Sequence, residues 1–269
     1  MHGLGNDFVV LDGRKDSLAL SPEAIARLAD RHFGIGCDQV IVLEPPSQPD
    51  ADLGARFFNS DGSESGACGN GSRCVVHLWM AETGKTTAQL ETAAGLLACE
   101  AQSDGRVTVD MGPARLDWTE IPLARALDTL HLPIDAGPLV DPVAVGMGNP
   151  HAVFFVPDLA AIDLAALGPV VEHHPLFPQR ANVEIVQVLS QGVVRMRVWE
   201  RGSGITLACG TGACAAAVAA ARRGHTGRRV RVILDGGPLD VAWDEDGRVR
   251  MTGPVATTFE GRLGPDLFE

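Results

Sequence analysis

Two cysteines stand out because the same short pattern follows each of them. Cys68 lies in the segment ACGNG, residues 67–71, and Cys209 lies in the segment ACGTG, residues 208–212. A cysteine before a Gly-x-Gly turn and an apolar run is typical of a thiol at the start of a helix. There, backbone N–H groups and a partial positive charge stabilise anions and lower the pKa of a thiol below its usual value of about 8.5. The pattern therefore predicts two reactive thiols.

The alternative is that these cysteines are small buried apolar residues, as free cysteines usually are. Burial alone gives no reason for Gly-x-Gly to follow both Cys68 and Cys209, so the duplicated setting favours chemistry for these two. The interpretation as buried reduced thiols fits the other four cysteines, which are Cys37, Cys74, Cys99 and Cys214.

The two cysteine motifs belong to an internal repeat. When the chain is laid on itself, the segment GNDFVV from Gly5 aligns with GNPHAV from Gly148, and DGRVTVDMGP, ending at Pro113, aligns with DGRVRMTGP, ending at Pro254. The offsets drift only from 143 to 141 residues, and matches this ordered indicate two homologous halves. We assign 1–113 to the first half and 114–254 to the second, with the proline-rich stretch 114–147 as a connector that holds a strand or two.

Each half shows the same order of predicted elements. In the first half, a strand over 8–12 precedes a helix with its N-cap at Ser21, Pro22 in its first position and Gly34 just past its end. In the second half, a strand over 152–156 precedes a helix from an N-cap at Asp163 to about His174. Alternating strands follow, and after each Cys-Gly-x-Gly comes a helix, over 72–84 and 213–224. The second of these helices is apolar on nearly all sides, so a sheet must surround it. We therefore predict an α+β fold of two pseudosymmetric domains across a cleft, each a curved, mostly antiparallel sheet wrapped around a central helix.

The composition narrows the possible partners. The chain of 269 residues is 45% hydrophobic and carries a formal net charge of −12, which disfavours nucleic acid and anionic membranes as partners and favours a small molecule. We find neither a signal peptide nor an apolar run of the roughly 18 residues that span a bilayer, so we expect a cytoplasmic protein with reduced thiols.

Two thiols on opposite sides of one ligand would form the site of a two-base racemase. One cysteine, as thiolate, removes a proton from a stereogenic carbon while the other, as thiol, donates a proton to the opposite face. Backbone N–H groups after each cysteine would hold the neighbouring carboxylate and stabilise the developing charge. These groups belong to Gly69, Asn70, Gly210 and Thr211.

The sequence favours chemistry without a cofactor. Pyridoxal phosphate, the usual electron sink for this reaction, requires a lysine, and the chain has only Lys15 and Lys85, both in turns. The cysteines form no CxxC pair and have no nearby series of histidines, so we expect no metal site.

Five longer motifs extend this interpretation, namely HGLGNDF, FFNSDGSESGACGNGSRC, GNPHAVFFV, NVEIVQV and WERGSGITLACGTGACA. With them the chain resembles the diaminopimelate epimerase family nearly from end to end. The resemblance implies a cofactor-free epimerase of lysine and peptidoglycan precursor synthesis, with Cys68 and Cys209 as acid and base. It also implies a homodimer. In addition, it implies that the segment 255–269 returns to pack with the first domain. Family members usually begin a few residues before the first motif, whereas Met1 lies inside it, so either the start is placed late or the first strand is shortened.

The resemblance also implies a set of residues that bind diaminopimelate. An arginine beside a glutamate suits the distal carboxylate and ammonium of this substrate. The alternatives are an exposed ion pair for Glu200 and Arg201, and ordinary turn chemistry for the asparagines next to glycine. The case for His151 is weaker, because Phe8 takes its place in the first half. The full set is Asn6, Gln39, Asn59, Gly69, Asn70, Asn149, His151, Asn182, Glu200, Arg201, Gly210 and Thr211.

Three other functions remain open on the sequence alone. Proline racemases and hydroxyproline epimerases resemble the same duplicated two-cysteine arrangement, although a ring substrate has no distal group for Glu200 and Arg201. A redox-regulated protein would use Cys68 and Cys209 as a reversible disulfide. An amino-acid-binding module would bind diaminopimelate without turnover.

Overall fold

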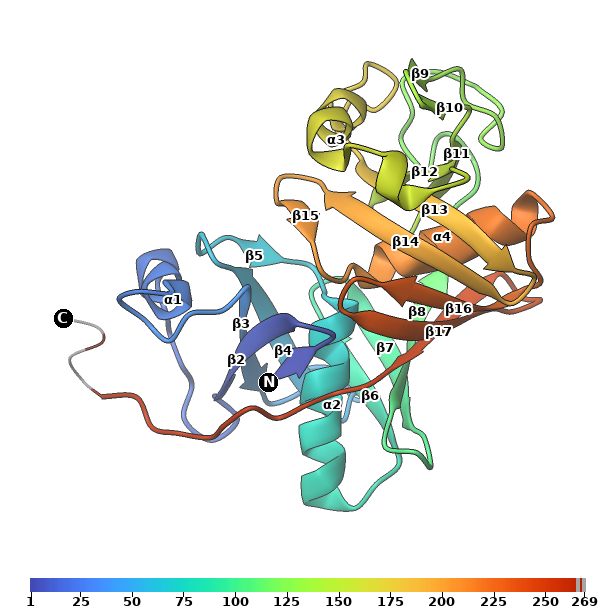
Figure 1. Ribbon diagram of the computed structural model, residues 1–269. Coiled ribbons are helices and arrows are strands. Elements are labelled where there is room, and N and C mark those ends of the chain that lie inside the picture. Colours follow the sequence, from blue (N-terminus) through green and yellow to red (C-terminus); the bar gives the residue numbers. More distant parts are fainter. Residues whose placement is uncertain (265–266, 268–269) are drawn as a thin grey trace. The chain divides into compact units, whose positions relative to one another are not determined.

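The chain forms two compact units. Unit 1 consists of Met1–Asp110 together with the segment from Gly253 onward, and unit 2 consists of Met111–Thr252. The computed structural model describes residues 1–264 and 267 and is drawn in Figure 1. We describe each unit by itself.

Unit 1 is a mixed sheet with two helices, α1 (Pro22–Ala29) and α2 (Gly69–Thr83). Its strands follow the order β1-β2-β3-β4-β6-β7-β8, and β5 pairs with β4. Among the described strands of this unit, only the pairs β2/β3 and β4/β6 are parallel. The strands are β1 His2–Gly3, β2 Asn6–Asp12, β3 Gln39–Glu44, β4 Leu53–Asn59, β5 Glu64–Ser65, β6 Thr87–Thr92, β7 Gly95–Ala101 and β8 Val107–Pro113.

Unit 2 repeats this plan with helices α3 (Leu164–Glu172) and α4 (Gly210–Arg222) and a short 3₁₀ helix, Leu159–Ala161. Its strands follow the order β11-β12-β13-β14-β16-β17-β18, β15 pairs with β14, and β9 pairs with β10. Again only two pairs, β12/β13 and β14/β16, are parallel. The strands are β9 Asp135–Ala136, β10 Leu139–Val140, β11 Val143–Gly146, β12 Pro150–Phe155, β13 Asn182–Ser190, β14 Val193–Glu200, β15 Gly204–Thr206, β16 Arg229–Leu234, β17 Gly237–Trp243 and β18 Arg248–Gly253.

The strand register confirms the repeat residue by residue. Phe8 pairs with Gln39 across β2 and β3, and His151 pairs with Asn182 across β12 and β13. Both members of the second pair lie 143 residues beyond their counterparts, which is the offset that the sequence gives. The predicted α+β fold of two pseudosymmetric halves with mostly antiparallel sheets is therefore confirmed.

The sheets curve around α2 and α4. Helix α2 contacts β1, β2, β4, β6 and β7, and α4 contacts β11, β12, β13, β14, β16 and β17. Every residue of α4 from Ala213 to Ala220 is buried, which agrees with its apolar sequence. Both helices begin three residues earlier than predicted, at Gly69 and Gly210 rather than after the second glycine, because the cysteine itself is the N-cap and Gly-x-Gly forms the first turn.

Helix α1 is shorter than the sequence predicts. Ser21 caps it and Pro22 is its first residue, as expected, but it ends at Ala29 rather than near Gly34. Asp30 has extended backbone angles, and its carboxylate accepts the N–H groups of His32 and Phe33 at 2.7 Å, which competes with further helical bonds. A side chain at Gly34 would lie 1.9 Å from the carbonyl oxygen of Arg27, so this glycine permits the chain to fold back onto the helix end.

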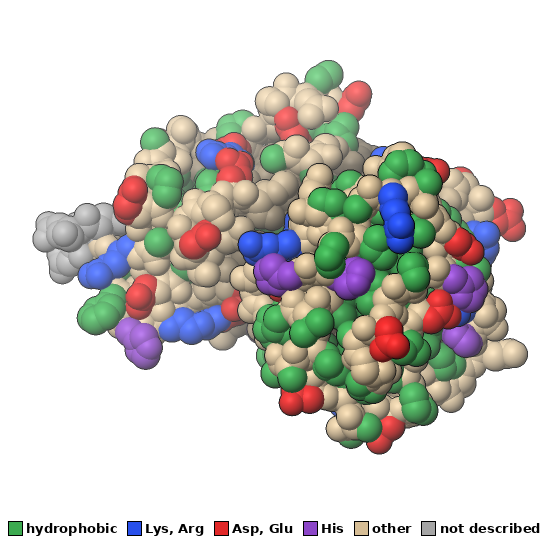
Figure 2. Space-filling model, turned by 90° about the horizontal axis from the view of Figure 1, so that it is seen from above, with side chains coloured by type: hydrophobic (Ala, Val, Ile, Leu, Met, Phe, Trp, Pro, Cys, Tyr) green, Lys and Arg blue, Asp and Glu red, His purple; other side chains and the backbone are tan. Residues whose placement is uncertain are grey.

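The predicted connector is part of the core of unit 2 rather than a linker. Its apolar residues Ile121, Leu132 and Leu139 are at most 1% exposed and pack with Phe154 and Ile185 of the sheet. Among the described residues, no helix has the length and apolar character required to cross a membrane. On the face shown in Figure 2, acidic and basic side chains are interspersed.

Candidate active site

The thiols of Cys68 and Cys209 occupy equivalent places at the N-termini of α2 and α4. Each cysteine is the N-cap of its helix in extended conformation. The Cys68 sulfur accepts the N–H of Gly71 at 3.5 Å, and the Cys209 sulfur accepts the N–H of Gly212 at 3.4 Å. The sulfur thus takes the place of the hydroxyl or carboxylate oxygen that usually caps a helix.

The second glycine of each motif is explained by packing beneath the first turn. A side-chain carbon at Gly71 would lie 2.9 Å from both Ile41 and Phe57, and one at Gly212 would lie 2.8 Å from Glu184. The helix can approach the sheet this closely only without a side chain at that position. The duplicated Gly-x-Gly therefore places the thiol against the sheet in both units.

The residues after each cysteine are placed as an anion site requires. Gly69 and Gly210 are the first residues of their helices, and Asn70 and Thr211 are the second. At these positions backbone N–H groups are not used by the helical ladder, and the helix dipole favours negative charge.

In unit 1, the predicted residues form a set of neutral amides around Cys68. The Cys68 thiol lies 3.8 Å from Oδ1 of Asn6, which also accepts the Asn70 side-chain amide at 3.2 Å. Separately, the Gln39 amide donates to Oδ1 of Asn59 at 3.0 Å.

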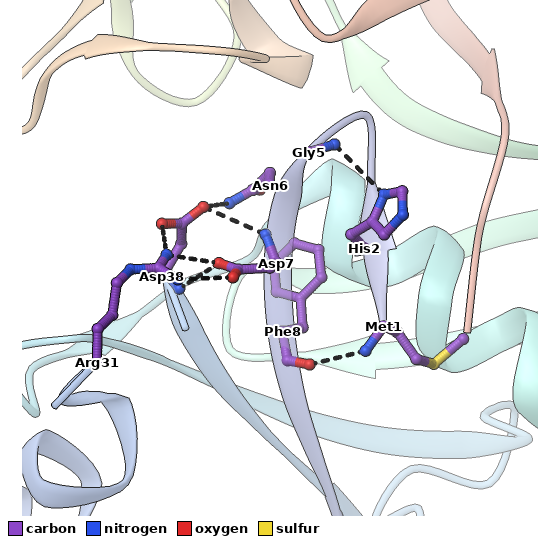
Figure 3. A network of polar contacts seen from close by, with 8 residues as sticks. All are labelled: Met1, His2, Gly5, Asn6, Asp7, Phe8, Arg31 and Asp38. Carbon is purple, nitrogen blue, oxygen red and sulfur yellow. Dashed lines mark hydrogen bonds and ion pairs between the residues drawn. The ribbon is translucent and has the colours of Figure 1, made fainter. Parts of the chain in front are cut away.

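The Asn6 side chain is anchored by an exposed ion-pair network that the sequence interpretation missed (Figure 3). Its amide nitrogen donates to Asp38 at 2.9 Å, and Arg31 bridges Asp38 and Asp7 at 2.8 Å. Burial raises the pKa of Asp7, but hydrogen bonds from Arg31 and from the Asp38 backbone outweigh burial, so its pKa is lowered from the usual value. In the sequence, the aspartate that follows Asn6 in the GNDF motif is the feature that could have indicated this network.

In unit 2, Cys209 is only 5% exposed and lies among ionisable groups. We expected the helix N-terminus to lower its pKa, and that expectation is wrong for this thiol. Burial raises the pKa of Cys209 well above its usual value, the carboxylates of Glu200 and Glu184 raise it further, and hydrogen bonds from Thr211 and Gly212 do not offset these effects. Cys209 is therefore a protonated thiol in this arrangement.

Glu200 lies beside the Cys209 thiol, which donates a hydrogen bond to its carboxylate. Its carboxylate also accepts the hydroxyl of Thr206. Burial raises the pKa of Glu200, and the bonds from Thr206 and Cys209 only partly oppose that rise. A carboxyl group with a raised pKa next to a thiol can exchange a proton with it.

Arg201 occupies different surroundings from Glu200. Its exposed guanidinium donates to the backbone oxygen of Gln179 at 3.1 Å. Its backbone N–H donates to Oδ1 of buried Asn182 at 2.9 Å, and Asn182 in turn donates to the Pro150 oxygen at 3.2 Å. Asn182 therefore fixes the backbone that carries Arg201.

A buried histidine and a buried glutamate complete the unit 2 site. His151 Nδ1 lies 2.7 Å from Oε1 of Glu184, and its Nε2 lies 2.9 Å from Oδ1 of Asn149. Both ionisable side chains are 0% exposed. Sequence reasoning missed Glu184, although a glutamate inside the apolar run NVEIVQV is the signal that could have found it.

The other cysteines fit the interpretation as buried thiols. Burial raises the pKa of Cys37 to about 11 and the pKa values of Cys74 and Cys99 to about 12. Cys214 is also buried and, like the other five cysteines, forms no disulfide. Over residues 1–264 and 267, no three His, Cys, Asp or Glu side chains gather in a way that could hold a metal ion.

Comparison with solved structures shows that other proteins share this fold. A hydroxyproline epimerase from Agrobacterium vitis matches 94% of this chain and 86% of its own, with a TM-score of 0.68 at 19% identity. A predicted epimerase from Pseudomonas aeruginosa matches 93% of this chain and 90% of its own, with a TM-score of 0.66 at 21% identity. At these identities the likeness establishes the fold.

Sequence comparison gives the family. The family model described as diaminopimelate epimerase matches residues 1–116 and 143–258. The diaminopimelate epimerase of Rhodospirillum centenum is 63% identical over 99% of this chain and 92% of its own length, and that of Gluconobacter oxydans is 56% identical over 97% and 96%. The chain belongs to the diaminopimelate epimerase family, and the resemblance seen in its motifs is confirmed.

Proposed function

We propose that this protein interconverts LL- and meso-diaminopimelate, with Cys68 and Cys209 as the two catalytic groups. The observation that carries the proposal is that both thiols are N-caps of equivalent helices in a chain of this family. One thiolate removes the α-proton, and the other thiol protonates the opposite face of the carbanion. The first domain consists of 1–113 with 255–269, and the second consists of 114–254. These two domains present the thiols to opposite sides of the substrate.

The substrate's reacting carboxylate binds to the first turns of α2 and α4. Backbone N–H groups of Gly69, Asn70, Gly210 and Thr211 hold it and stabilise the charge that develops beside it. The amides of Asn6, Gln39, Asn59, Asn149 and Asn182 orient the substrate, with His151 lining the pocket. Arg201 pairs with the distal carboxylate, and Glu200 adds negative charge toward the ammonium groups while sharing a proton with Cys209.

The chain's lysines support chemistry by thiols alone. Lys85 lies 3.0 Å from the Asp52 carboxylate, stacks on the Trp79 ring and is 58% exposed, and Lys15 is exposed. An exposed, paired lysine is poorly suited to a buried Schiff base.

The direct test follows the α-proton. Reduced protein without added pyridoxal phosphate is incubated with LL-diaminopimelate in D₂O, and the loss of the α-proton and the formation of the meso isomer are followed by NMR. Inversion with deuterium incorporation supports the two-thiol epimerase. Folded protein with free thiols and no exchange would contradict it, and proline and hydroxyproline would then be tested, since hydroxyproline epimerase shares the fold.

A redox test examines whether the two thiols lie on either side of one substrate. We expect mild oxidation to join Cys68 and Cys209 in a disulfide that abolishes activity, and reductant to restore it. Full activity in protein whose disulfide is shown by mass spectrometry would rule out the catalytic assignment. Cys209→Ala cannot form this bond, so mass spectrometry of the oxidised variant reports any disulfide that forms elsewhere.

The remaining assignments are a homodimer working in the cytoplasm and supplying the meso isomer for lysine and peptidoglycan precursors. Light scattering coupled to size exclusion distinguishes a dimer from the 28.3 kDa monomer. A monomer that retains full turnover would remove the dimer from the proposal.

A further inference from the structure

A continuous polar chain in unit 2 runs from a buried carboxylate to the Cys209 sulfur. Glu184 Oε1 lies 2.7 Å from His151 Nδ1, and His151 Nε2 lies 2.9 Å from Asn149 Oδ1. The Asn149 amide donates to the Thr211 hydroxyl at 3.4 Å, and that hydroxyl lies 3.5 Å from Cys209 Sγ. The first two members are fully buried, so solvent does not screen them.

Hydrogen-bond counting fixes the protons on the buried pair in this arrangement. Both ring nitrogens of His151 face oxygen atoms, one from Glu184 and one from Asn149. Each of these contacts needs one proton, so the pair Glu184–His151 holds two protons and has no net charge, whichever side of the 2.7 Å contact the first proton occupies. The Thr211 hydroxyl, which accepts from Asn149, then donates to sulfur. That polarity favours the thiolate of Cys209, and so it opposes the burial and the two carboxylates that keep this thiol protonated.

Rotation of the Asn149 amide by half a turn reverses the polarity of the whole chain. The Asn149 nitrogen then donates to His151, and the imidazole ring keeps one proton. The Asn149 oxygen accepts a hydrogen bond from the Thr211 hydroxyl, and the hydroxyl oxygen accepts one from the S–H of Cys209. When the starting state is the thiolate, the proton that leaves the pair is the one that the sulfur gains, so the net charge of the cluster is unchanged. The two arrangements therefore favour opposite states of the same thiol.

We propose that Glu184 is a positioning residue that, through His151, Asn149 and Thr211, governs the protonation state of the Cys209 thiol. The inference rests on the proposed function for its role in turnover, but not for its effect on the thiol itself. One further observation supports it. Glu184 Oε2 has no hydrogen-bond partner among the described residues, and a carboxylate buried in this way is costly unless it serves its one partner.

The ionisable groups around Cys209 come from three neighbouring strands. Glu200 ends β14, Glu184 lies in β13 and His151 lies in β12, and the two carboxylates both raise the pKa of the thiol. Glu200 contacts the thiol directly, whereas Glu184 reaches it through the chain. A variant of Glu184 therefore tests the chain without removing a group that touches the sulfur or the substrate.

The experiment measures the pH dependence of alkylation at Cys209 by mass spectrometry, in the full-length protein with the substitution Glu184→Gln. Glutamine keeps the length and one hydrogen bond but removes the charge and the second proton. Because the glutamine amide can donate to His151 Nδ1, the single ring proton stays on Nε2 and the chain keeps the polarity that favours the thiolate. We therefore expect the alkylation midpoint to move to lower pH by about one unit. The alkaline limb of kcat/KM moves in the same direction, since the donor thiol is lost at lower pH. An unchanged midpoint in folded protein overturns the proposal.

A double-mutant cycle separates action along the chain from action through space. Thr211→Val removes the hydroxyl that links Asn149 to sulfur and leaves Glu184 and His151 in place. If the chain carries the effect, the shift caused by Glu184→Gln falls to half or less in the Thr211→Val background. An equal shift in both backgrounds means that the charge acts through space and contradicts the positioning role.

Controls address folding and the proposed function. Glu172→Gln removes another buried carboxylate of unit 2, 3% exposed and bonded to Trp199, and is expected to leave the Cys209 midpoint in place. If Glu184→Gln does not fold, Glu184→Asp, which is one methylene too short for the 2.7 Å contact, breaks the chain at its first link, and an unchanged midpoint in that variant overturns the proposal. If wild-type protein does not epimerise diaminopimelate but the midpoint still shifts, the proposed function fails and the inference about Glu184 stands.

Discussion

The same backbone holds Cys68 in unit 1 and Cys209 in unit 2, yet their surroundings differ in charge. His151 takes the place of Phe8, and Glu184 takes the place of Ile41, which packs beneath Gly71 as Glu184 packs beneath Gly212. The third change is that Glu200 takes the place of Asn59, as the strand pairing shows. Val40 pairs with Phe58, and Val183 pairs with Trp199, so the residues that come next, Asn59 and Glu200, are equivalent.

Three uncharged positions of unit 1 are thus ionisable in unit 2. The network around Cys68 runs outward to an exposed ion pair of Arg31 with Asp7 and Asp38, which water screens. The network around Cys209 runs inward to a buried pair. Duplication therefore explains the geometry shared by the two thiols, and a few substitutions beneath the helices make them chemically unequal.

The strongest test of this comparison removes each thiol. Cys68→Ala and Cys209→Ala are each expected to lower the rate of epimerisation by about 1,000-fold or more, because each thiol supplies general acid or base catalysis. Substrate binding, measured by calorimetry, should persist. Cys99→Ala, which removes a thiol that is 4% exposed in β7, should keep full turnover. An epimerisation rate unchanged in either active-site variant would contradict the two-thiol mechanism.

Alanine at the second glycine of each motif probes the packing beneath the two helices. Gly71→Ala meets the Phe57 ring and Ile41 at 2.9 Å and should lower the free energy of unfolding by about 1–3 kcal/mol. Gly212→Ala meets the end of Glu184 at 2.8 Å and the Cys209 side chain at 3.3 Å, so it should displace that carboxylate and that thiol and reduce activity more than stability. Urea denaturation and steady-state kinetics of both variants provide the measurement. Adding Ile41→Val to Gly71→Ala should recover only part of the loss, since Phe57 remains.

The substitution Glu200→Gln replaces the carboxyl group with an amide, the group that its counterpart Asn59 carries. Burial raises the pKa of Glu200 from its usual value of 4.5, so the folded state holds this proton more tightly than the unfolded state. Its contribution to stability is fully present below the unfolded pKa and is lost as the pH rises through the folded pKa. Wild-type protein should therefore lose more stability than Glu200→Gln between pH 5 and pH 8 in thermal melts. The exposed control Glu245→Gln should follow the wild-type curve, and a parallel curve for Glu200→Gln would contradict the assignment.

The smallest effect is expected at the exposed end of the unit 1 network. Arg31→Ala should cost less than about 1 kcal/mol at neutral pH, because the Arg31 side chain is 54% exposed. The pKa of Asp7 is lowered in the folded state, so the stabilisation is present above its unfolded pKa and disappears as the pH falls through its folded pKa. Denaturation at pH 7 and pH 3 measures this difference. A cost that persists at pH 3 would show that packing, rather than charge, is lost.

Local sequence signals predicted much of this molecule. The offset of 141–143 residues matches the strand register, Ser21 and Pro22 start α1, and the cysteines are found at helix starts. The end of α1 and the role of the connector were not predicted. They depend on Asp30 binding backbone N–H groups that follow it and on Ile121 and Leu132 packing into a distant sheet.

The sequence by itself determined the duplication, the fold of each half, the family and the two thiols, because repeats, caps and motifs are local and survive in the order of residues. Only the tertiary structure decided the protonation state of Cys209 and the importance of Glu184. The helix N-terminus favours a thiolate, but burial and two carboxylates from other strands favour the thiol, and they outweigh it. Such a balance depends on the distances between residues far apart in the chain, and those distances exist only after folding.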